Sequence, residues 1–327
     1  MSVGANDRMG AAGAPCPACP SGVGAMEQQP VILTVVGDSA AGKTTLTAGV
    51  AAILGPERVV ALHFDDYHRY NRAEREAHGL TPLHPDCNHL ELMEQHLAHL
   101  AAGKTIAKPV YDHTTGEVEA FQPLEAAPFV LAEGLLGLAT PRLRAPCHVR
   151  VFLDPSEDLR ECWKLSRDCT RRGYTVEQVR AEIARRRPDA IEFIQPQRGW
   201  ADIVVCFYPN PSAPAQQLNV RLILRPRLAY PDFSTLIARQ GDPPALHLRV
   251  GRDEGRLTEI LEIDGRLSSQ QAATIEEVIW DELPGLHHLS PDQLGTYRDG
   301  NEPRHSHTLG IVQLLIAAQL LRATVVV

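Results

Sequence analysis

Apolar runs alternate with helical patterns along the first two thirds of the chain. The run VILTVV begins at Val31, and a turn of small residues and the helical pattern TTLTAGVAAIL follow it. Further apolar runs occur in RVVALHF, PFVLAEG and HVRVFLD. Strands that alternate with helices are typical of an α/β protein with a mainly parallel sheet. We therefore expect the four runs to be strands of one such sheet, with the first of them buried.

The pattern changes after Phe207. The polar, Pro-containing segment NPSAPAQQ is followed by LNVRLILRP, ALHLRV and LTEILEID, which predict strands that either extend the core sheet at an antiparallel edge or form a dimer surface. EEVIWDEL and TLGIVQLLIAAQLL predict helices. Gln313, Gln319 and Arg322 interrupt the last apolar stretch, which favours a buried or subunit-facing helix over a membrane span.

Three parts of the chain follow from these patterns. Residues 1–29 are rich in Gly, Ala and Pro and lack an apolar run, so we predict a disordered tail there. Residues 30–208 are expected to form the core together with two basic helices. Residues 209–327 are expected to form a β-rich extension whose C-terminal helix packs on the core or extends it.

Charge and cysteine content narrow the function classes. The chain has 32 Lys and Arg against 40 Asp and Glu, and its net charge of -8 argues against a general affinity for nucleic acid or for anionic membranes. The 7 cysteines are odd in number and scattered, unlike the disulfide framework of a secreted protein. We therefore expect a cytoplasmic protein.

The first turn carries a phosphate-binding motif. Residues 37–44, GDSAAGKT, match the pattern GxxxxGK[ST] between a predicted strand and a predicted helix. In such a P-loop, backbone N–H groups cradle the β-phosphate, Lys43 reaches the β and γ oxygens, and the Thr44 hydroxyl binds Mg²⁺. A chance match in a turn of small residues is the alternative. The expected ATP-binding residues are Gly37, Asp38, Ser39, Ala40, Ala41, Gly42, Lys43, Thr44 and Thr45.

Two adjacent carboxylates, Asp65 and Asp66, follow the second strand. Ligands of open α/β sheets bind beyond the carboxyl ends of the strands, and a carboxylate there can accept the proton of a hydroxyl that attacks the γ-phosphate. The alternative is a solvated loop in which an aspartate caps the helical segment RAEREAHGL. A third carboxylate, Glu133, is costly at the end of a core strand unless it is paired or near a metal. It is a candidate magnesium ligand, with an ion-paired or helix-capping glutamate as the alternative.

Positive charge gathers after the fourth strand. Residues 160–187 contain nine Lys and Arg against four Asp and Glu. One helix is expected to end at Gly173, and a capping box of Thr175 and Gln178 opens a second. The simplest interpretation of this positive charge is a solvent-exposed helical face. Two basic helices at a glycine hinge also suit a lid that clamps phosphate groups, and the clustering then implies a strongly anionic substrate besides ATP.

Several blocks together resemble one family. GDSAAGKTT, FDDYHRYNR, KPVYDHTTGEV, LAEGL, KLSRDCTRRGYT and IQPQRGWAD occur in the order found in the phosphoribulokinase and uridine kinase family, and most resemble its phosphoribulokinases. The resemblance implies a P-loop NTPase core with a mixed, mainly parallel sheet flanked by helices. It also implies that ATP and Mg²⁺ serve to phosphorylate ribulose 5-phosphate at its 1-hydroxyl, a step of the Calvin cycle. Ala40 and Ala41 stand where the plant and cyanobacterial enzymes carry a regulatory cysteine, which argues against a thioredoxin switch of that kind.

The resemblance also implies roles for individual residues. Asp65 would be the general base, Asp168 a second catalytic carboxylate, and Lys43 a catalytic contact to the phosphates. Thr44 and Glu133 would serve the metal. The expected substrate-binding residues, from the resemblance and from the basic cluster, are His68, Arg72, Tyr111, His113, Lys164, Arg167, Arg172, Arg185 and Arg186.

The sequence thus predicts an ATP-dependent kinase of ribulose 5-phosphate, acting as a homodimer or a larger homo-oligomer. A kinase of a neutral nucleoside or small alcohol, like uridine kinase, remains open, although it would need base-stacking aromatics rather than arginines. An ATP-binding regulatory protein that kept the fold and lost the transfer chemistry also remains open.

Overall fold

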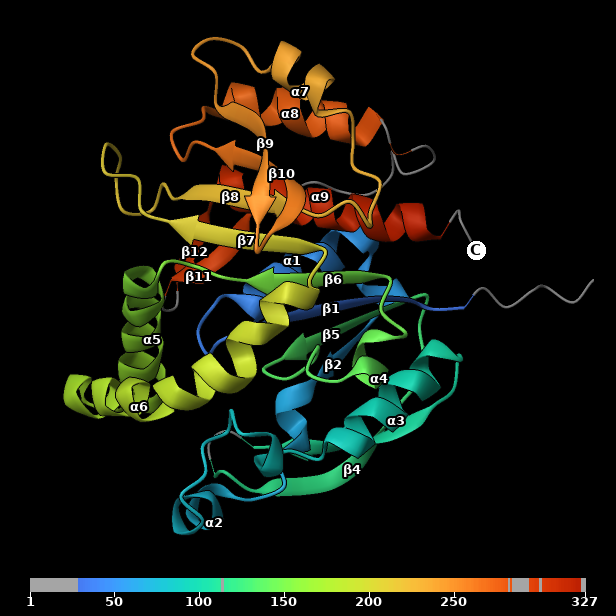
Figure 1. Cartoon of the computed structure of the whole chain (residues 1–327), viewed down its shortest axis with the longest axis vertical. Helices are drawn as coiled ribbons and strands as arrows, with labels where there is room; N and C mark the ends of the chain where they lie inside the picture. The colour runs from blue at the N-terminus through green and yellow to red at the C-terminus, as the bar shows by residue number, and fades with distance from the viewer. Residues whose placement is uncertain (1–28, 113–114, 282, 284–293, 300–301, 325–327) are drawn as a thin grey trace, which may run out of the picture.

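The computed structural model describes residues 29–112, 115–281, 283, 294–299 and 302–324. An eight-stranded sheet runs through the molecule, with helices on both faces (Figure 1). In spatial order its strands are β2 (Val59–His63), β5 (Phe129–Gly134), β1 (Val31–Gly37), β6 (Val149–Leu153), β7 (Ile203–Tyr208), β8 (Asn219–Leu224), β10 (Arg256–Ile263) and β9 (Leu246–Asp253). The first five strands run parallel, and the last three continue the sheet antiparallel.

Central strands are apolar because helices cover both of their faces. Every residue of β1 and β5 is buried. Successive residues of β1 alternate between two hydrophobic clusters, with Leu33 and Val35 on one face and Ile32 and Val36 on the other. The prediction of four strands in a mainly parallel sheet is confirmed. Strand β2 lies at the edge of the sheet, and Leu62 is its one buried residue.

The predicted helix boundaries in the basic region are also confirmed. Helix α5 (Glu157–Arg172) ends at Gly173, whose φ of 71° suits a residue without a side chain. Helix α6 (Val176–Asp189) begins with the capping box of Thr175 and Gln178. An N-capping role for Asp65 or Asp66 is wrong, because Asn71 caps the helix that follows them.

The remaining elements surround the sheet. The helices are α1 (Lys43–Leu54), α2 (Arg72–Ala77), α3 (Leu90–Ala101), α4 (Pro141–Arg144), α7 (Phe233–Arg239), α8 (Ser269–Asp281) and α9 (His307–Ala323). Two hairpins pair β3 (Ile106–Tyr111) with β4 (Val118–Leu124) and β11 (Thr296–Asp299) with β12 (Glu302–His305). Short 3₁₀ and π turns span Pro56–Arg58, Phe64–Tyr67, Pro85–Cys87, Ala190–Ile194 and Gln195–Trp200.

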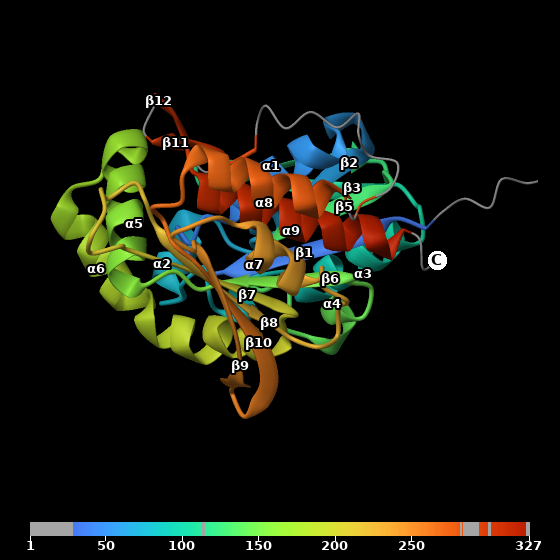
Figure 2. The same cartoon turned by 90° about the horizontal axis from the view of Figure 1, so that it is seen from above.

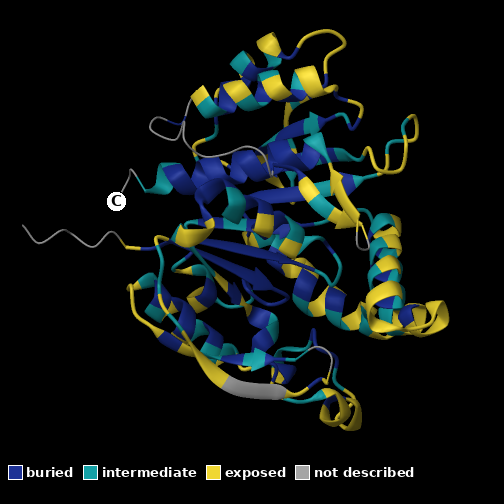
Figure 3. Ribbon diagram, turned by 180° about the vertical axis from the view of Figure 1, so that it is seen from behind, coloured by how far each residue is buried: buried dark blue, intermediate teal, exposed yellow. Residues whose placement is uncertain are grey.

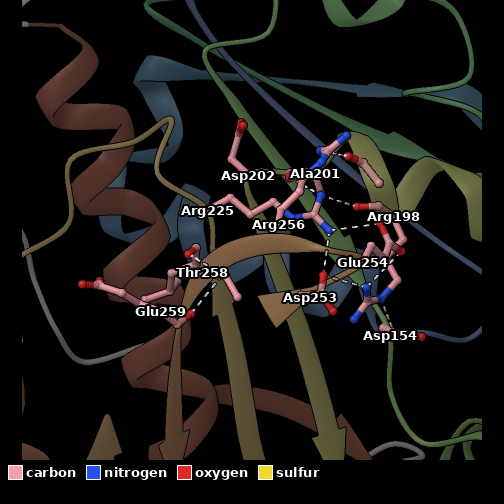
Figure 4. A network of polar contacts seen from close by, with 12 residues as sticks. Asp154, Arg198, Ala201, Asp202, Arg225, Asp253, Glu254, Arg256, Thr258 and Glu259 are labelled. Carbon is pink, nitrogen blue, oxygen red and sulfur yellow. Dashed lines mark hydrogen bonds and ion pairs between the residues drawn. The ribbon is translucent and has the colours of Figure 1, made fainter. Parts of the chain in front are cut away.

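The C-terminal strands extend the core sheet, which settles one alternative left open by the sequence. NPSAPAQQ lies in the connection between the neighbouring strands β7 and β8. The turn between β9 and β10 is tied back to the core by ion pairs (Figure 4). Arg198 binds Asp154 and Asp253 at 3.0 and 2.9 Å, and Arg225 binds Asp253 at 2.8 Å. The block IQPQRGWAD thus contributes Arg198 to the packing of the extension.

Helix α9 is a core helix. Its residues from Thr308 to Leu321 are buried, and it packs against α1, α8 and β1 (Figures 2 and 3). Among the described residues, no helix combines the length and the apolar character that crossing a membrane requires.

A close contact joins α9 to the helix that follows the P-loop. Gln313 is fully buried; its Nε2 donates to the Thr45 carbonyl oxygen at 3.1 Å, and its Oε1 accepts from the Gly295 N–H at 2.9 Å. A Cβ atom on Gly49 would lie 2.0 Å from Gln313 Nε2. Gly49 is therefore required by the space that Gln313 fills.

Gly49→Ala is expected to destabilise the protein by about 1–3 kcal/mol, although alanine is normally the better helix former, because the new methyl group displaces the buried Gln313 amide from its partners. Urea unfolding measures the loss. In a Gln313→Ala background the same change should cost less, since the obstacle is gone. Additive losses, or a more stable Gly49→Ala variant, would contradict this account.

Candidate active site

A wide pocket opens beyond the carboxyl ends of β1, β2 and β5, between the sheet and helices α5 and α6. It is lined by Lys43 of the P-loop, Asp65 after β2, Glu133 of β5 and Asp168 of α5. His113 lies outside the described residues. The other predicted residues that line the pocket are Ser39, Ala40, Ala41, Gly42, Thr44, Thr45, His68, Arg72, Tyr111, Lys164, Arg167, Arg172, Arg185 and Arg186.

The P-loop has the form that its glycines predict. A Cβ on Gly37, whose φ is 154°, would lie 2.6 Å from the Leu153 carbonyl oxygen, and Gly42 has a φ of 95°. Among the described side chains none caps the start of α1, so its first N–H groups can receive a phosphate group. Lys43 Nζ donates to the carbonyl oxygens of Gly37 and Asp38 at 2.9 and 3.0 Å.

Loss of solvent lowers the pKa of Lys43, while the nearby carboxylates of Asp65 and Glu133 act in the opposite direction. The lysine therefore lies within electrostatic reach of both candidate carboxylates. A negatively charged phosphate at this point would favour its protonated form.

Glu133 gathers three hydrogen bonds. Thr44 Oγ1 donates to Glu133 Oε1 at 2.8 Å, and Thr47 Oγ1 donates to Oε2 at 2.7 Å. His63 Nδ1 lies 3.0 Å from Oε1. Burial raises the pKa of the carboxyl, but these hydrogen bonds outweigh burial and hold the pKa below its usual value. The hydrogen bond to Glu133 in turn raises the pKa of His63. Glu133 is thus an ionised carboxylate beside the P-loop hydroxyl.

This arrangement fits a magnesium ion shared with a nucleotide. The oxygens of Thr44 and Glu133 are hard donors of the kind that Mg²⁺ prefers. Within the described ranges, no group of three or more His, Cys, Asp or Glu side chains could hold a metal by itself. The ion would therefore need phosphate oxygens to complete its coordination, as is common for Mg²⁺.

The adjacent carboxylates Asp65 and Asp66 have different surroundings. Asp66 is buried; its Oδ2 binds Lys108 Nζ at 2.5 Å, and its Oδ1 accepts from the Tyr111 N–H at 3.1 Å. Both carboxylates line the pocket, but Asp65 is half-buried and acts electrostatically on Lys43. The geometry therefore favours Asp65 as the group that meets a substrate and Asp66 as an anchor for the β3–β4 hairpin.

One wall of the pocket contains a buried arginine that the sequence did not single out. Arg75 donates to the Tyr111 hydroxyl at 2.8 Å and to the Tyr70 carbonyl at 2.9 Å. His68 packs edge-on against the Tyr111 ring, with ring centroids 4.9 Å apart. The spacing of Arg75 three residues after Arg72 is the one signal that could have found it, since residues i and i+3 share a helix face.

The opposite wall is the basic helix α5. Asp168 is buried there among three cations, with Lys164 at 3.0 Å, Arg167 at 2.8 Å and Arg172 at 3.4 Å. Burial alone would raise the pKa of Asp168, but the cations lower it to about 2. Burial, with a contribution from the Arg186 charge, lowers the pKa of Lys164 to about 8 even though Asp168 opposes the shift. On α6, Arg185 and Arg186 pair with Glu182.

Arg160 connects α5 to the P-loop. Its guanidinium lies 3.2 Å from the Asp38 carboxylate and donates to the Ser39 carbonyl oxygen, also at 3.2 Å. Arg167 adds a contact to Ser39 Oγ at 3.3 Å. Arg160 also pairs with Glu157 at 2.6 Å within α5. The sequence placed Arg160 in the basic cluster but gave it no role, because its P-loop partners lie far away along the chain.

Comparison with known proteins agrees with these features. The family model described as "Phosphoribulokinase / Uridine kinase family" matches residues 32–212. The chain belongs to the phosphoribulokinase and uridine kinase family. This kinase is 30% identical to the phosphoribulokinase of Synechocystis sp. over 316 residues, covering 89% of this chain and 92% of that protein.

Two further relatives match different shares of the chain. The uridine kinase of Chloroflexus aggregans is 32% identical over 183 residues, covering 55% of this kinase and 88% of that protein. The solved phosphoribulokinase of Rhodobacter spheroides has a TM-score of 0.57 at 21% identity, covering 78% of this chain and 97% of that chain, which shows a shared fold. The predicted family, α/β fold and kinase class are confirmed.

Proposed function

We propose that this kinase transfers the γ-phosphate of ATP to the 1-hydroxyl of ribulose 5-phosphate. The observation that carries the proposal is the charge of the pocket beyond Lys43 and Asp65, where Arg72, Lys164 and Arg172 line the walls. Arginine and lysine there suit an acceptor that already bears a phosphate group. The similarity to phosphoribulokinases over 89% of the chain supports the same acceptor.

In this mechanism Asp65 accepts the proton of the attacking hydroxyl, and Lys43 together with the N-terminus of α1 stabilises the charge of the transferred group. Bound through Thr44 and Glu133, Mg²⁺ would neutralise charge on the phosphate oxygens. Helix α5 brings Lys164, Arg167 and Arg172 over the reacting groups. The acceptor's own phosphate is held by members of the set His68, Arg72, Tyr111, Lys164, Arg172, Arg185 and Arg186.

An acceptor panel tests the proposal. ADP release is measured with ATP and Mg²⁺ in the presence of ribulose 5-phosphate, ribose 5-phosphate or uridine, with an acceptor-free reaction as the control for hydrolysis. We expect turnover with ribulose 5-phosphate and competitive inhibition by inorganic phosphate. Turnover with uridine alone would indicate that the acceptor is a neutral nucleoside. ATP hydrolysis that no acceptor stimulates would favour a nucleotide-dependent regulatory protein.

Acceptor use should depend on pH through Lys164. Its pKa is about 8, so the ammonium group is charged below that pH and neutral above it. We expect kcat/KM for the sugar phosphate to fall as the pH rises through about 8, because the neutral amine no longer attracts the acceptor phosphate. A pH profile of kcat/KM measures this.

Lys164→Met is the matched control for that profile. The variant should have a lower kcat/KM at neutral pH and should lose the break near pH 8. A break that persists in the variant would assign the titration to another group, such as Lys43.

A further inference from the structure

The pocket continues past the P-loop, on the side away from Asp65. The sheet order puts β2 and β5 on one side of β1 and puts β6 and β7 on the other. Asp65 and Glu133 belong to the first side. The second side is lined by Trp163 of α5, Phe207 at the end of β7, and Tyr297 and Arg298 of β11. A molecule whose phosphates sit on the P-loop can therefore extend in two directions, toward Asp65 or toward β11.

These two halves of the pocket differ in chemistry. The half near Asp65 is rich in charged side chains. The second half combines the apolar side chains of Leu159, Trp163, Phe207, Leu218 and Leu309 with the polar side chains of Asp158, Gln216, Arg298 and Asp299. Trp163 Cζ3 would lie 3.8 Å from a Cβ atom on Gly42, so the indole ring borders the P-loop directly. It packs edge-on against Phe207, with ring centroids 6.3 Å apart. Apolar and aromatic walls with polar groups among them suit a flat, uncharged ring system that also carries hydrogen-bonding atoms.

The β11–β12 hairpin is held firmly at this place. Its first strand begins after Gly295, whose N–H donates to Gln313 Oε1 at 2.9 Å, while the same glutamine binds the Thr45 carbonyl of the P-loop helix at 3.1 Å. The Ser306 N–H donates to the Gly295 carbonyl at 2.9 Å and closes the base of the hairpin. In Figures 1 and 2 the hairpin lies beside α5. One buried side chain thus fixes β11 relative to the phosphate-binding turn.

We propose that the β11–β12 hairpin forms the outer wall of the nucleobase subsite, where Tyr297 and Arg298 contact the adenosine of the nucleotide whose phosphates occupy the P-loop. The inference rests on the proposed use of ATP and deepens it. The family model ends at residue 212, so the match does not assign the hairpin to this site. Tyr297 is half-buried and packs in part against the hydrophobic core, and Arg298 is exposed and carries hydrogen-bond donors.

Binding titrations without an acceptor test this subsite. Calorimetry is performed with ADP, which carries the base, and with inorganic tripolyphosphate, which lacks it, on the full chain in the presence of Mg²⁺. Tyr297→Ala and Arg298→Ala are each expected to weaken ADP binding about tenfold, the size of one lost base contact, and to leave tripolyphosphate binding unchanged. Arg298 is exposed, so its variant keeps the test open if Tyr297→Ala does not fold.

Arg304→Ala is the matched control, because Arg304 is the cross-strand partner of Tyr297 in the same hairpin but does not line the pocket. It should bind both ligands as the wild type does. Unchanged ADP affinity in the Tyr297 and Arg298 variants, or equal weakening of both ligands, would overturn the proposal. A wild-type protein that binds neither ligand would overturn the nucleotide function itself, and a failure of that kind is distinguishable from a failure of the hairpin alone.

Discussion

Asp65→Asn is expected to lower kcat by about 100- to 10,000-fold, the usual contribution of a general base. The affinity for ATP and the thermal stability should change little. Asp65 lies at the pocket after β2 and is half-buried, so the isosteric amide removes a proton acceptor without opening the core. Coupled turnover assays give kcat, and calorimetry gives the dissociation constant for ATP. Similar losses of turnover and of ATP affinity would count against the role of base.

Asp66→Asn is the matched control for this prediction, because the two carboxylates are adjacent and only their contacts differ. The Asp66 change removes the charge partner of Lys108 and weakens the contact to the Tyr111 N–H. We expect a loss of stability of about 3 kcal/mol, as for a buried ion pair that loses one member. If Asp66→Asn abolished turnover in a stably folded protein while Asp65→Asn did not, the assignment of the base would be reversed.

The contrast between these neighbours shows where sequence reasoning stops. The chain order identifies the carboxyl end of β2 as a place for catalysis, because apolar runs and the P-loop are local patterns. It does not distinguish Asp65 from Asp66. The contacts that do so come from Lys108 and Tyr111, which lie 42 and 45 residues further along the chain.

Other contacts at the site join residues that are still further apart in the sequence. Arg160 meets Ser39 across 121 residues, and Gln313 meets Thr45 across 268 residues. The helix ends at Gly173 and Thr175 were predictable because caps are set by neighbouring residues. The contacts of Arg160, Arg75 and Gln313 were not predictable, because side-chain types alone do not specify partners in distant segments. The expectation of a homo-oligomer stays a prediction, since a single chain carries no test of it.

The role of Asp168 differs between the resemblance and the structure. The resemblance implies a catalytic carboxylate, whereas the contacts of Asp168 indicate a structural role. The side chain is only 5% exposed and accepts from Lys164 and Arg167, with Arg172 at 3.4 Å. Three cations of one helix would repel each other without this charge. We propose that Asp168 acts as a positioning residue that holds the cations of α5 toward the substrate. A mutation of such a residue has different effects from a mutation of a residue that transfers a proton.

Asp168→Asn is expected to destabilise the protein by about 3–5 kcal/mol, because it leaves the buried Lys164 without its counter-charge. It should also raise KM for the sugar phosphate, since the cations of α5 lose their common anchor. Thermal unfolding and steady-state kinetics measure the two effects. A catalytic carboxylate would instead give a large loss of kcat at unchanged stability, and that result would contradict the positioning role.

A more exposed cluster of ion pairs on the neighbouring helix α6 and the pH dependence of the effect complete this test. Glu182→Gln breaks the pairs with Arg185 and Arg186, of which the Arg185 side chain is 47% exposed, and should cost less than about 1 kcal/mol. The folded-state pKa of Asp168 lies below its ordinary value of 3.8, so its stabilising charge is fully present above that pH. The stability difference between the wild type and Asp168→Asn should therefore shrink as the pH falls from 3.8 toward about 2, because protonation removes the same charge that the mutation removes.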